Sequence, residues 1–546
     1  MAGYQQAMSD ALPERLPSAL RRERVRITEF PGLREGRTGI LSGMTNLSPR
    51  CAPELATRLP RGLFASPVGS GKPHGMVFFD GRLFFARGAR LYCTVNGRDV
   101  TDMGAVSDTD KQFFVFGDRL FILPDKVFAD KGGTVLHAAE LDTGVIEKVE
   151  FSGSNAILPA GMSWTALGFG IGDGLRVVNA DEAEPAPEGN YRIAELHGRE
   201  ATVVGSFPAP YTSNARFQRK LPDLKRVCVS GNRVFGIVGR DLYVSAAGSA
   251  LDFYSRQDRD GQGPAILPSD TEGDFTACAA WQGYVICFKA DRICKLVGSR
   301  SDSFGWQDSA AVGIPGRLAD TLCEVDGALC YCAAGGVYRY RGQQPVRIAS
   351  AGERTLTDGH GGTDGVRYYL AVETRDGVWK QSVYHPEDGM HYDEDGLCPA
   401  DMLCRDGFLW IQDGDGYIWM TSSDGRMGET SVDERTAKGA VRASVTLAPD
   451  YTYFPDGCRP TAVMLRATAD AGATLEVRGD YADGRAGKDA DGTAEVILGS
   501  FTGRMRDRWL RIPLKPERCD GMHLRLIMTG GWVIHEIIRE YEQGGR

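Results

Sequence analysis

Short runs of alternating apolar and polar residues, separated by glycine-bearing turns, dominate the chain. The stretch Val229–Ser249, VSGNRVFGIVGRDLYVSAAGS, is typical. Its Gly231 and Asn232 tolerate the positive φ angles of a hairpin turn, and the β-branched, aliphatic and aromatic residues around them suit a pleated surface. The pattern therefore predicts strand, tight turn, strand, turn and strand.

This hairpin phrase recurs along the chain. Each copy has a turn glycine, a Leu or Val with an apolar partner, a second turn and another apolar or aromatic pair. Aligned on the first glycine, the copies lie at Gly81, Gly117, Gly231, Gly283, Gly327, Gly365 and Gly407. From Gly231 onward these glycines are separated by 52, 44, 38 and 42 residues, close to the ~40 to 50 residues of a four-stranded propeller blade. We predict an all-β fold with a β-propeller of about 6–8 blades; stacked sandwiches are the alternative, because spacing alone does not prove closure.

Two regions depart from the period and predict further domains. Gly117 and Gly231 are 114 residues apart, and the strand-like runs between them predict a small β domain inserted in a surface loop. Near the C-terminus, Leu475 and Val477 alternate with charged residues, the period of a half-buried antiparallel sheet, which predicts a β-sandwich. The predicted domains are an extended N-terminal arm with a short helical start (1–62), the first propeller blades (63–149), the inserted β domain (150–222), the remaining blades (223–435) and the C-terminal β-sandwich (436–546).

Composition supports a globular chain of several domains. The 546 residues are 42% hydrophobic and 25% charged, and 69 glycines spread over turn-like positions favour many short strands. The formal net charge of −9 does not indicate a nucleic-acid binder. No segment approaches the ~18 apolar residues of a membrane span, and the first thirty residues lack the apolar core of a signal peptide, so we expect folding in a cytoplasm. The 13 cysteines form no CxxC pair, which favours buried reduced thiols over a zinc site or a disulfide framework.

Several short motifs match ligand-binding loops only in part. GSGKPH has Ser66 where a phosphate loop needs its first glycine, and Pro73 where the loop needs Ser or Thr. GFGIGDG has Asp173 in place of the third glycine of a dinucleotide fingerprint. DRDGQG (258–263) has the oxygen spacing of a calcium loop but Ser269 at its twelfth position, and DGDG and DADG elsewhere are similar. We interpret all of these as plain turns.

The segment HPEDGMHYDEDG is the densest cluster of acidic and histidine side chains. Its members are His385, Glu387, Asp388, His391, Asp393, Glu394 and Asp395. The turn-rich setting favours a solvated loop, with a metal or acid–base site as the alternative. No HExxH, GxSxG or Ser-His-Asp spacing is present, and a glycosidase pair is defined by a spatial separation that sequence does not give. We therefore assign no catalytic, cofactor-binding or metal-binding residue.

The linear order of phrases resembles a family of tailed-bacteriophage β-propeller virion proteins from phages and prophages of gut Firmicutes. The phrases are FPGLREGRTGILSGMTNLSPRCAPELATRLPRG, GMVFFDGRLFFARGARLYCTV, FVFGDRLFILPDKVFAD, LKRVCVSGNRVFGIVGRDLYVSAAGSALDFY, FTACAAWQGYVICFKADRICKLVGSRSDSF and CEVDGALCYCAAGGVYRYRGQQP. The chain is also broadly similar to podophage tail-hub, packaged-DNA stabilisation and tail-nozzle proteins. The resemblance covers nearly the whole chain. Where the family has Leu-Trp and Asp-Pro, this chain has Val234-Phe235 and Ser249-Ala250, swaps that keep apolar and turn character.

This resemblance implies a structural role and offers no catalytic residues. We expect a non-enzymatic component of the neck, tail or tail-tip conduit, located in the virion after assembly in the host cytoplasm, with other virion proteins as partners and a homo-oligomeric ring as its form. An acidic net charge suits a lumen through which DNA slides. The alternative is a carbohydrate-binding or carbohydrate-active propeller, including receptor binding at the tail tip. Trp410, Trp419 and Trp532 could stack on sugars, although their alternating-strand positions favour the core.

The N-terminal arm is the predicted source of contacts between subunits. Residues 30–62 combine prolines and turn glycines with many arginines, a composition that favours an extended strap lying on another surface. The chain's 72 carboxylates, against 63 Lys and Arg, supply partners for such arginines. The candidate contact residues are Arg34, Arg37, Arg50, Arg58 and Arg61.

Overall fold

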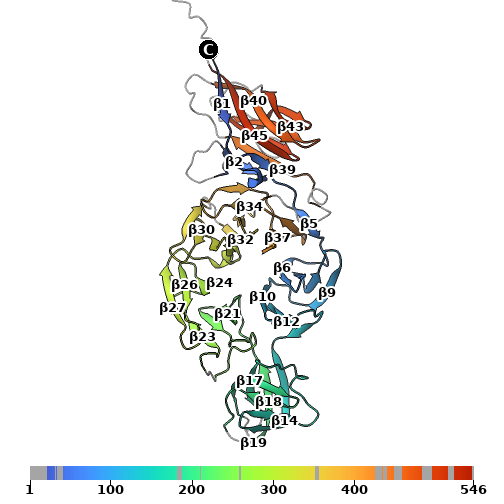
Figure 1. Cartoon of the computed structure of the whole chain (residues 1–546), viewed down its shortest axis with the longest axis vertical. Helices are drawn as coiled ribbons and strands as arrows, with labels where there is room; N and C mark the ends of the chain where they lie inside the picture. Colours follow the sequence, from blue (N-terminus) through green and yellow to red (C-terminus); the bar gives the residue numbers. More distant parts are fainter. Residues whose placement is uncertain are drawn as a thin grey trace, which may run out of the picture.

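The described part of the chain is built almost wholly from β-strands. The computed structural model describes residues 21–30, 32–33, 41–180, 187–208, 211–256, 260–350, 356–424, 433, 439–447, 458–481, 495–514 and 522–543. The helices in this part are two short 3₁₀ segments, η1 (Pro49–Cys51) and η2 (Gly316–Thr321), and none of them is long and apolar enough to cross a bilayer. The predicted all-β fold is confirmed. Figure 1 shows packed sheets at one end, a ring of small sheets in the middle and a small barrel at the other end.

Seven antiparallel four-stranded sheets, numbered here 1 to 7, form the ring. Sheets 1 to 3 contain β6 (Pro73–Phe79), β7 (Arg82–Arg87), β8 (Arg90–Thr94) and β9 (Val100–Ala105); β10 (Gln112–Phe116), β11 (Arg119–Leu123), β12 (Val127–Asp130) and β13 (Leu136–Ala138); and β20 (Arg226–Ser230), β21 (Arg233–Val238), β22 (Asp241–Val244) and β23 (Ala265–Pro268). Sheets 4 and 5 contain β24 (Ala277–Trp281), β25 (Tyr284–Phe288), β26 (Arg292–Val297) and β27 (Gly305–Ala310); and β28 (Cys323–Val325), β29 (Ala328–Ala333), β30 (Gly336–Tyr340) and β31 (Val346–Ala349). Sheets 6 and 7 contain β32 (Leu356–Thr363), β33 (Tyr368–Thr374), β34 (Trp379–Tyr384) and β35 (His391–Asp393); and β36 (Pro399–Arg405), β37 (Phe408–Asp413), β38 (Ile418–Thr421) and β5 (Gly62–Ala65).

Each repeat phrase of the sequence forms the hairpin between the first two strands of one sheet. The seven turn glycines all have positive φ, from 54° at Gly231 to 94° at Gly365. In sheets 5 and 7 the preceding Asp326 and Asp406 also have positive φ, 48° and 54°, as a type I′ turn requires. Such angles strain residues that carry a Cβ. The position of every one of these hairpins was therefore predictable from local sequence.

Sheet 7 combines segments from opposite parts of the chain. Its outermost strand is β5, which pairs antiparallel with β38 so that Leu63 lies opposite Trp419. Its first strand, β36, contacts β6 of sheet 1. Two side chains of sheet 7 accept hydrogen bonds from the backbone of β6: Gln412 Oε1 from the Gly75 amide at 3.0 Å and Asp401 Oδ2 from the Met76 amide at 2.8 Å. The last sheet is thereby joined to the first.

The inserted domain is a closed six-stranded barrel. Its strands, in barrel order, are β14 (Leu141–Ser152), β15 (Asn155–Ile157), β18 (Glu200–Val203), β17 (Gly189–His197), β16 (Gly174–Asn179) and β19 (Tyr211–Arg219). Side chains such as Trp164 and Phe217, both fully buried, fill its interior. The barrel begins nine residues before the expected boundary of 150, because the first half of the long strand β14 pairs with the end of β19, with Leu141 opposite Arg219.

Two facing sheets form the sandwich. One has the order β3 (Leu47–Ser48), β4 (Leu55–Thr57), β45 (Trp532–Gln543), β40 (Cys458–Ala469) and β43 (Met505–Pro513), with β1 (Arg21–Ile27) also paired to β45. The other has the order β2 (Leu41–Thr45), β39 (Arg442–Leu447), β44 (Met522–Thr529), β41 (Thr474–Tyr481) and β42 (Glu495–Thr502). Leu475, Val477, Leu524 and Leu526 are all buried in one core between these sheets, as their alternation predicted.

The N-terminal arm is not a separate strap in its described part. Strands β1 to β4 belong to the sandwich and β5 belongs to sheet 7. The arginines of β1 lie beside carboxylates of β45: Arg22 bonds Glu542 at 3.2 Å, and Arg24 contacts Glu540 at 3.1 Å. The domain boundaries at 62 and 436 are corrected accordingly, since one sandwich takes strands from both termini. Residues 1–20, where a short helix was expected, lie outside the described residues.

Candidate functional site

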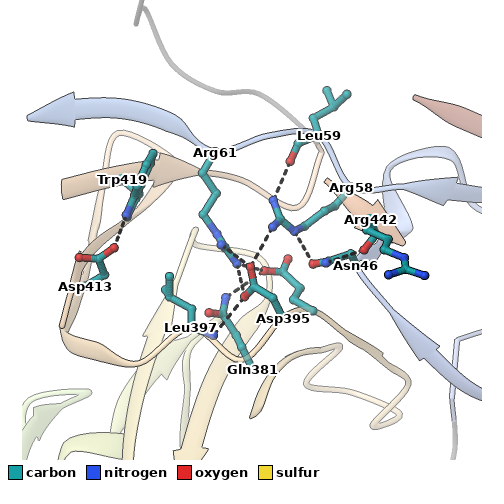
Figure 2. Close-up of polar contacts among 11 residues, drawn as sticks. Asn46, Arg58, Leu59, Arg61, Gln381, Asp395, Leu397, Asp413, Trp419 and Arg442 are labelled. Atoms are coloured by element: carbon teal, nitrogen blue, oxygen red, sulfur yellow. Dashed lines mark hydrogen bonds and ion pairs between the residues drawn. The ribbon is translucent and has the colours of Figure 1, made fainter. Parts of the chain in front are cut away.

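A buried polar cluster lies where the arm crosses from the sandwich to the ring of sheets. Figure 2 shows its side chains reaching toward one another from the turn between β2 and β3, from the segment after β4, from β34 and from the segment after β35. We call it the junction cluster, and its members are Asn46, Arg58, Arg61, Gln381, Glu394 and Asp395.

Arg61 is the central cation of the junction cluster. Its side chain is 1% exposed. Arg61 Nη1 donates to Asp395 Oδ2 at 2.8 Å, and Nη2 donates to Asp395 Oδ1 at 3.0 Å and to Glu394 Oε2 at 2.8 Å. This two-pronged contact matches the planar fork of a guanidinium to a carboxylate. Gln381 Nε2 donates to the same Glu394 oxygen at 3.0 Å.

Arg58 connects the cluster to the sandwich. Its Nη2 donates to Asp395 Oδ2 at 2.9 Å, and its Nε donates to Asn46 Oδ1 at 2.7 Å. Asn46 in turn donates through Nδ2 to the carbonyl of Arg442, the first residue of β39, at 2.9 Å. A chain of hydrogen bonds therefore runs from sheet 6 of the ring into the sandwich (Figure 2).

Two cations and two carboxylates balance the formal charge of the cluster. Burial raises the pKa of the Asp395 carboxyl, but the Arg61 and Arg58 guanidiniums outweigh it and hold the pKa well below its ordinary range. A carboxyl with a lowered pKa in the folded state stabilises the fold above its unfolded pKa of about 4, and this contribution is lost as the pH falls. The arrangement suits a structural role in holding the sandwich against the ring, since both carboxylates already have cationic partners.

The five arginines that were predicted to contact another subunit fall into two groups. Arg34 and Arg37 lie outside the described residues. Arg50, Arg58 and Arg61 all bond within the chain, with Arg50 Nε donating to the Thr57 carbonyl at 3.1 Å. The expectation that Arg58 and Arg61 contact another subunit is corrected, because both side chains are buried in the junction cluster.

The acidic and histidine side chains of the segment 385–395 bond to different partners and do not form one site. Glu387 pairs with Arg339 at 2.6 Å and with Arg341 at 2.5 Å, and Asp388 contacts His385 at 2.9 Å. The interpretation as a solvated loop is wrong for His391–Asp393, which form strand β35, and for Glu394 and Asp395, which enter the junction cluster. Among the described residues, no group of three or more His, Cys, Asp and Glu side chains is arranged to hold a metal ion.

The motifs that resembled ligand loops form local turns where they are described. Asp413 of DGDG accepts the backbone amides of Asp415 and Tyr417 at 3.0 and 2.9 Å, and the Trp419 indole at 2.8 Å. Asp173 of GFGIGDG accepts the Gly170 amide at 2.8 Å and pairs with the buried Arg219. DADG lies outside the described residues, as does part of DRDGQG.

A cavity of about 560 Å³ lies where the barrel meets sheets 2 and 3. Its lining includes Arg119, Lys131, Asp130 and the exposed Ile171. Arg119 Nε donates to Asp130 Oδ1 at 3.1 Å, and the guanidinium carbon of Arg119 lies 4.6 Å from the centre of the Phe128 ring. Two of the charged side chains of the lining, Arg119 and Asp130, are therefore paired with each other.

The three tryptophans considered for sugar stacking are buried, and a different tryptophan is exposed. Trp410, Trp419 and Trp532 are 7%, 1% and 0% exposed, so the core interpretation is confirmed. Trp509 of β43 is instead 51% exposed, opposite Arg466 of β40. The sequence of β43 did not reveal which face of this strand would be outward.

Comparison with known proteins identifies no family. No family model matches the chain, and no curated protein matches it. Among solved structures, the computationally designed Ika8 protein is 11% identical, with 66% of this chain and 99% of that chain covered and a TM-score of 0.34. Raptor from Chaetomium thermophilum is 12% identical over 66% of this chain and 29% of that chain, with a TM-score of 0.37. Hsv2p from Kluyveromyces lactis is 10% identical over 70% and 94%, with a TM-score of 0.29.

Proposed function

We propose that this chain is a structural component of a bacteriophage virion, forming part of the neck, tail or tail-tip conduit through protein contacts, and that its seven sheets are the blades of a β-propeller. The observation that carries the proposal is the layout in Figure 1, a ring of sheets with a folded module at each end. A layout of this kind presents separate surfaces to neighbours on opposite sides. The family resemblance of the repeat phrases supports the same role.

The proposal includes assembly as a homo-oligomeric ring with other virion proteins as partners. Identical subunits joined head to tail close into rings when the rotation between them closes. The net charge of −9 supports a lumen that repels DNA phosphates. Arg34, Arg37 and the half-exposed Arg50 are the remaining candidates for contacts between subunits.

Mass spectrometry of purified phage particles tests this function. Cells that carry the gene are induced, and intact particles are separated from soluble protein by density-gradient centrifugation. We expect the chain to band with the particles in a fixed ratio to the other structural proteins. Its absence from intact, infectious particles would contradict the proposal, and antibody labelling of particles that contain it would locate it at the neck, tail or tip.

Carbohydrate binding is the second candidate, and one observation favours it. Trp509 presents an exposed ring between two ion pairs on the same sheet: Arg466 bonds Asp507 at 2.7 Å, and Arg511 bonds Glu540 at 2.8 Å. An aromatic face flanked by fixed polar groups suits a sugar ring. A glycan array with wild-type protein and with Trp509→Ala tests it: binding that the substitution abolishes supports this function, and no binding by wild-type protein excludes it for the glycans on the array.

A further inference from the structure

Two thiols meet between neighbouring sheets of the ring. Cys228 lies on β20 of sheet 3 and Cys278 lies on β24 of sheet 4. These are the first strands of adjacent sheets and they contact each other. Both side chains pack against the same hydrophobic cluster between the two sheets, which includes Cys287 and Cys294.

The two thiols form one end of a row of four. Cys278 lies directly opposite Cys287 of β25, and Cys287 lies directly opposite Cys294 of β26. Residues directly opposite in antiparallel strands project to the same face of a sheet, so these three thiols face sheet 3 together. Cys287 and Cys294 are 0% and 1% exposed, whereas Cys228 and Cys278 are half-buried. A small reagent from solvent therefore reaches the Cys228–Cys278 end of the row.

We propose that Cys228 and Cys278 are an oxidisable pair that forms a disulfide joining sheet 3 to sheet 4. The oxidant is a low-molecular-weight disulfide. One thiol of the pair loses its proton to solvent, and its thiolate attacks a sulfur of the small disulfide, forming a mixed disulfide and releasing one small thiol. The second protein thiolate then attacks the protein sulfur of the mixed disulfide and releases the other small thiol. The two protein thiols are oxidised and the small disulfide is reduced to two thiols.

The surroundings of the pair make this reaction slow near neutral pH. The hydrogen bond to Cys278, together with burial, raises the pKa of the Cys228 thiol, and burial raises the pKa of the Cys287 thiol behind the pair. The thiolate is the nucleophile, so crosslinking accelerates as the pH rises. The thiols stay reduced in a reducing cytoplasm and become linked after prolonged contact with an oxidising medium. This inference does not depend on the proposed virion role.

Peptide mapping of the oxidised protein tests the proposal. Folded full-length protein is incubated with oxidised glutathione at mildly alkaline pH, its remaining thiols are blocked with N-ethylmaleimide, and it is digested without reduction. We expect one dominant linked peptide pair containing Cys228 and Cys278, which dithiothreitol separates. The linked protein should melt at a higher temperature than the reduced protein, because the crosslink restrains the unfolded chain.

Two variants provide matched controls. Cys228→Ala should abolish the linked pair, whereas Cys294→Ala, at the buried end of the row, should leave its yield unchanged. A dominant Cys278–Cys287 link would overturn the proposal, because it would join two strands of one sheet. Recovery of Cys228 and Cys278 only as free thiols or as mixed disulfides with glutathione would overturn it as well.

Discussion

Arg61 is the shared cationic partner of two carboxylates at the junction of the sandwich and the ring. It bonds Glu394 and Asp395 while remaining almost completely buried. A buried charge is tolerated when its partners remain, and it is costly when one partner is removed. At the residue scale, a single substitution in the junction cluster therefore has a large and specific cost.

Arg61→Met tests the contribution of that cation. We expect a loss of about 3 kcal/mol in the free energy of unfolding, because the methionine leaves the buried Glu394 and the half-buried Asp395 with less positive charge beside them. The measurement is chemical denaturation near neutral pH. The matched control is Arg341→Met, which removes a half-exposed partner of Glu387 and should cost no more than about 1 kcal/mol. Equal losses in the two variants would contradict the assigned role of Arg61.

Asp401 gives a prediction with the opposite pH dependence. Burial, with a smaller effect of Asp320, raises its pKa to about 6, although the hydrogen bond from the Met76 amide acts against this. The unfolded pKa is about 4, so between these two values the folded state holds a proton that the unfolded state has lost. Stability therefore decreases as the pH rises through this window.

Asp401→Asn should flatten that decrease. The asparagine is neutral at every pH, and its Oδ1 can still accept from the Met76 amide. We expect the variant to be at least as stable as the wild type near neutral pH, and its melting temperature to change less between about pH 4 and 6. Melting curves across this range provide the measurement. Parallel profiles for the two proteins would show that Asp401 is not the titrating group.

At the element scale, the barrel is a closed unit with adjacent ends. Leu141 and Arg219, its first and last strand residues, lie opposite each other in one strand pair. Its core is a cluster of its own around Trp164 and Phe217. The ring of sheets resumes at β20 with the same hairpin phrase that precedes the insertion. These features indicate that the ring does not need the barrel strands for its own sheets.

Replacing residues 141–219 by a short glycine-serine linker should leave the ring folded. We expect one cooperative melting transition to remain and the circular-dichroism spectrum to keep its β-sheet form. Deletion of residues 150–222, the bounds that the sequence predicted for the inserted domain, is a useful comparison. This deletion leaves most of β14 in the chain without its partner β19, and we expect a less soluble protein. Aggregation of the 141–219 deletion as well would show that the barrel supports sheets 2 and 3.

At the scale of the whole molecule, the N-terminal segment ties the sandwich to the ring. Four of its strands lie in the sandwich and the fifth completes sheet 7. Apolar residues such as Ile27, Leu47 and Leu55 are buried in the sandwich core. The junction cluster lies between these two contributions. Both large parts of the molecule therefore share one segment of chain.

Removal of residues 1–62 should impair folding as well as assembly. The truncation deletes β1 to β4 and the first residue of β5, so we expect loss of the cooperative transition of the sandwich. Removal of residues 1–20 alone is the control, since it spares every described strand. Solubility and thermal melting give the measurement. A truncated 63–546 chain that melts like the full protein would contradict the shared-segment interpretation.

The sequence by itself determined the local elements. The hairpins at Gly81, Gly283 and Gly407 were identifiable because a two-residue turn with positive φ needs particular residues, and the flanking strands show their inward faces by alternation. The sandwich core around Leu475 and Val477 was identifiable for the same reason. These features depend on interactions between residues close together in the chain, which a short window of sequence contains.

Only the tertiary structure decided which distant segments meet. The backbone hydrogen bonds of a strand pair are nearly independent of sequence, so the residues Gly62–Ala65 do not reveal their pairing with β38. Arg58 and Arg61 were recognised as contact residues, and Glu394 and Asp395 as part of an acidic segment, but their separation of more than 300 positions concealed that they pair. Whether an ion pair is buried depends on what packs around it, and that is fixed when the sandwich, the arm and the ring come together.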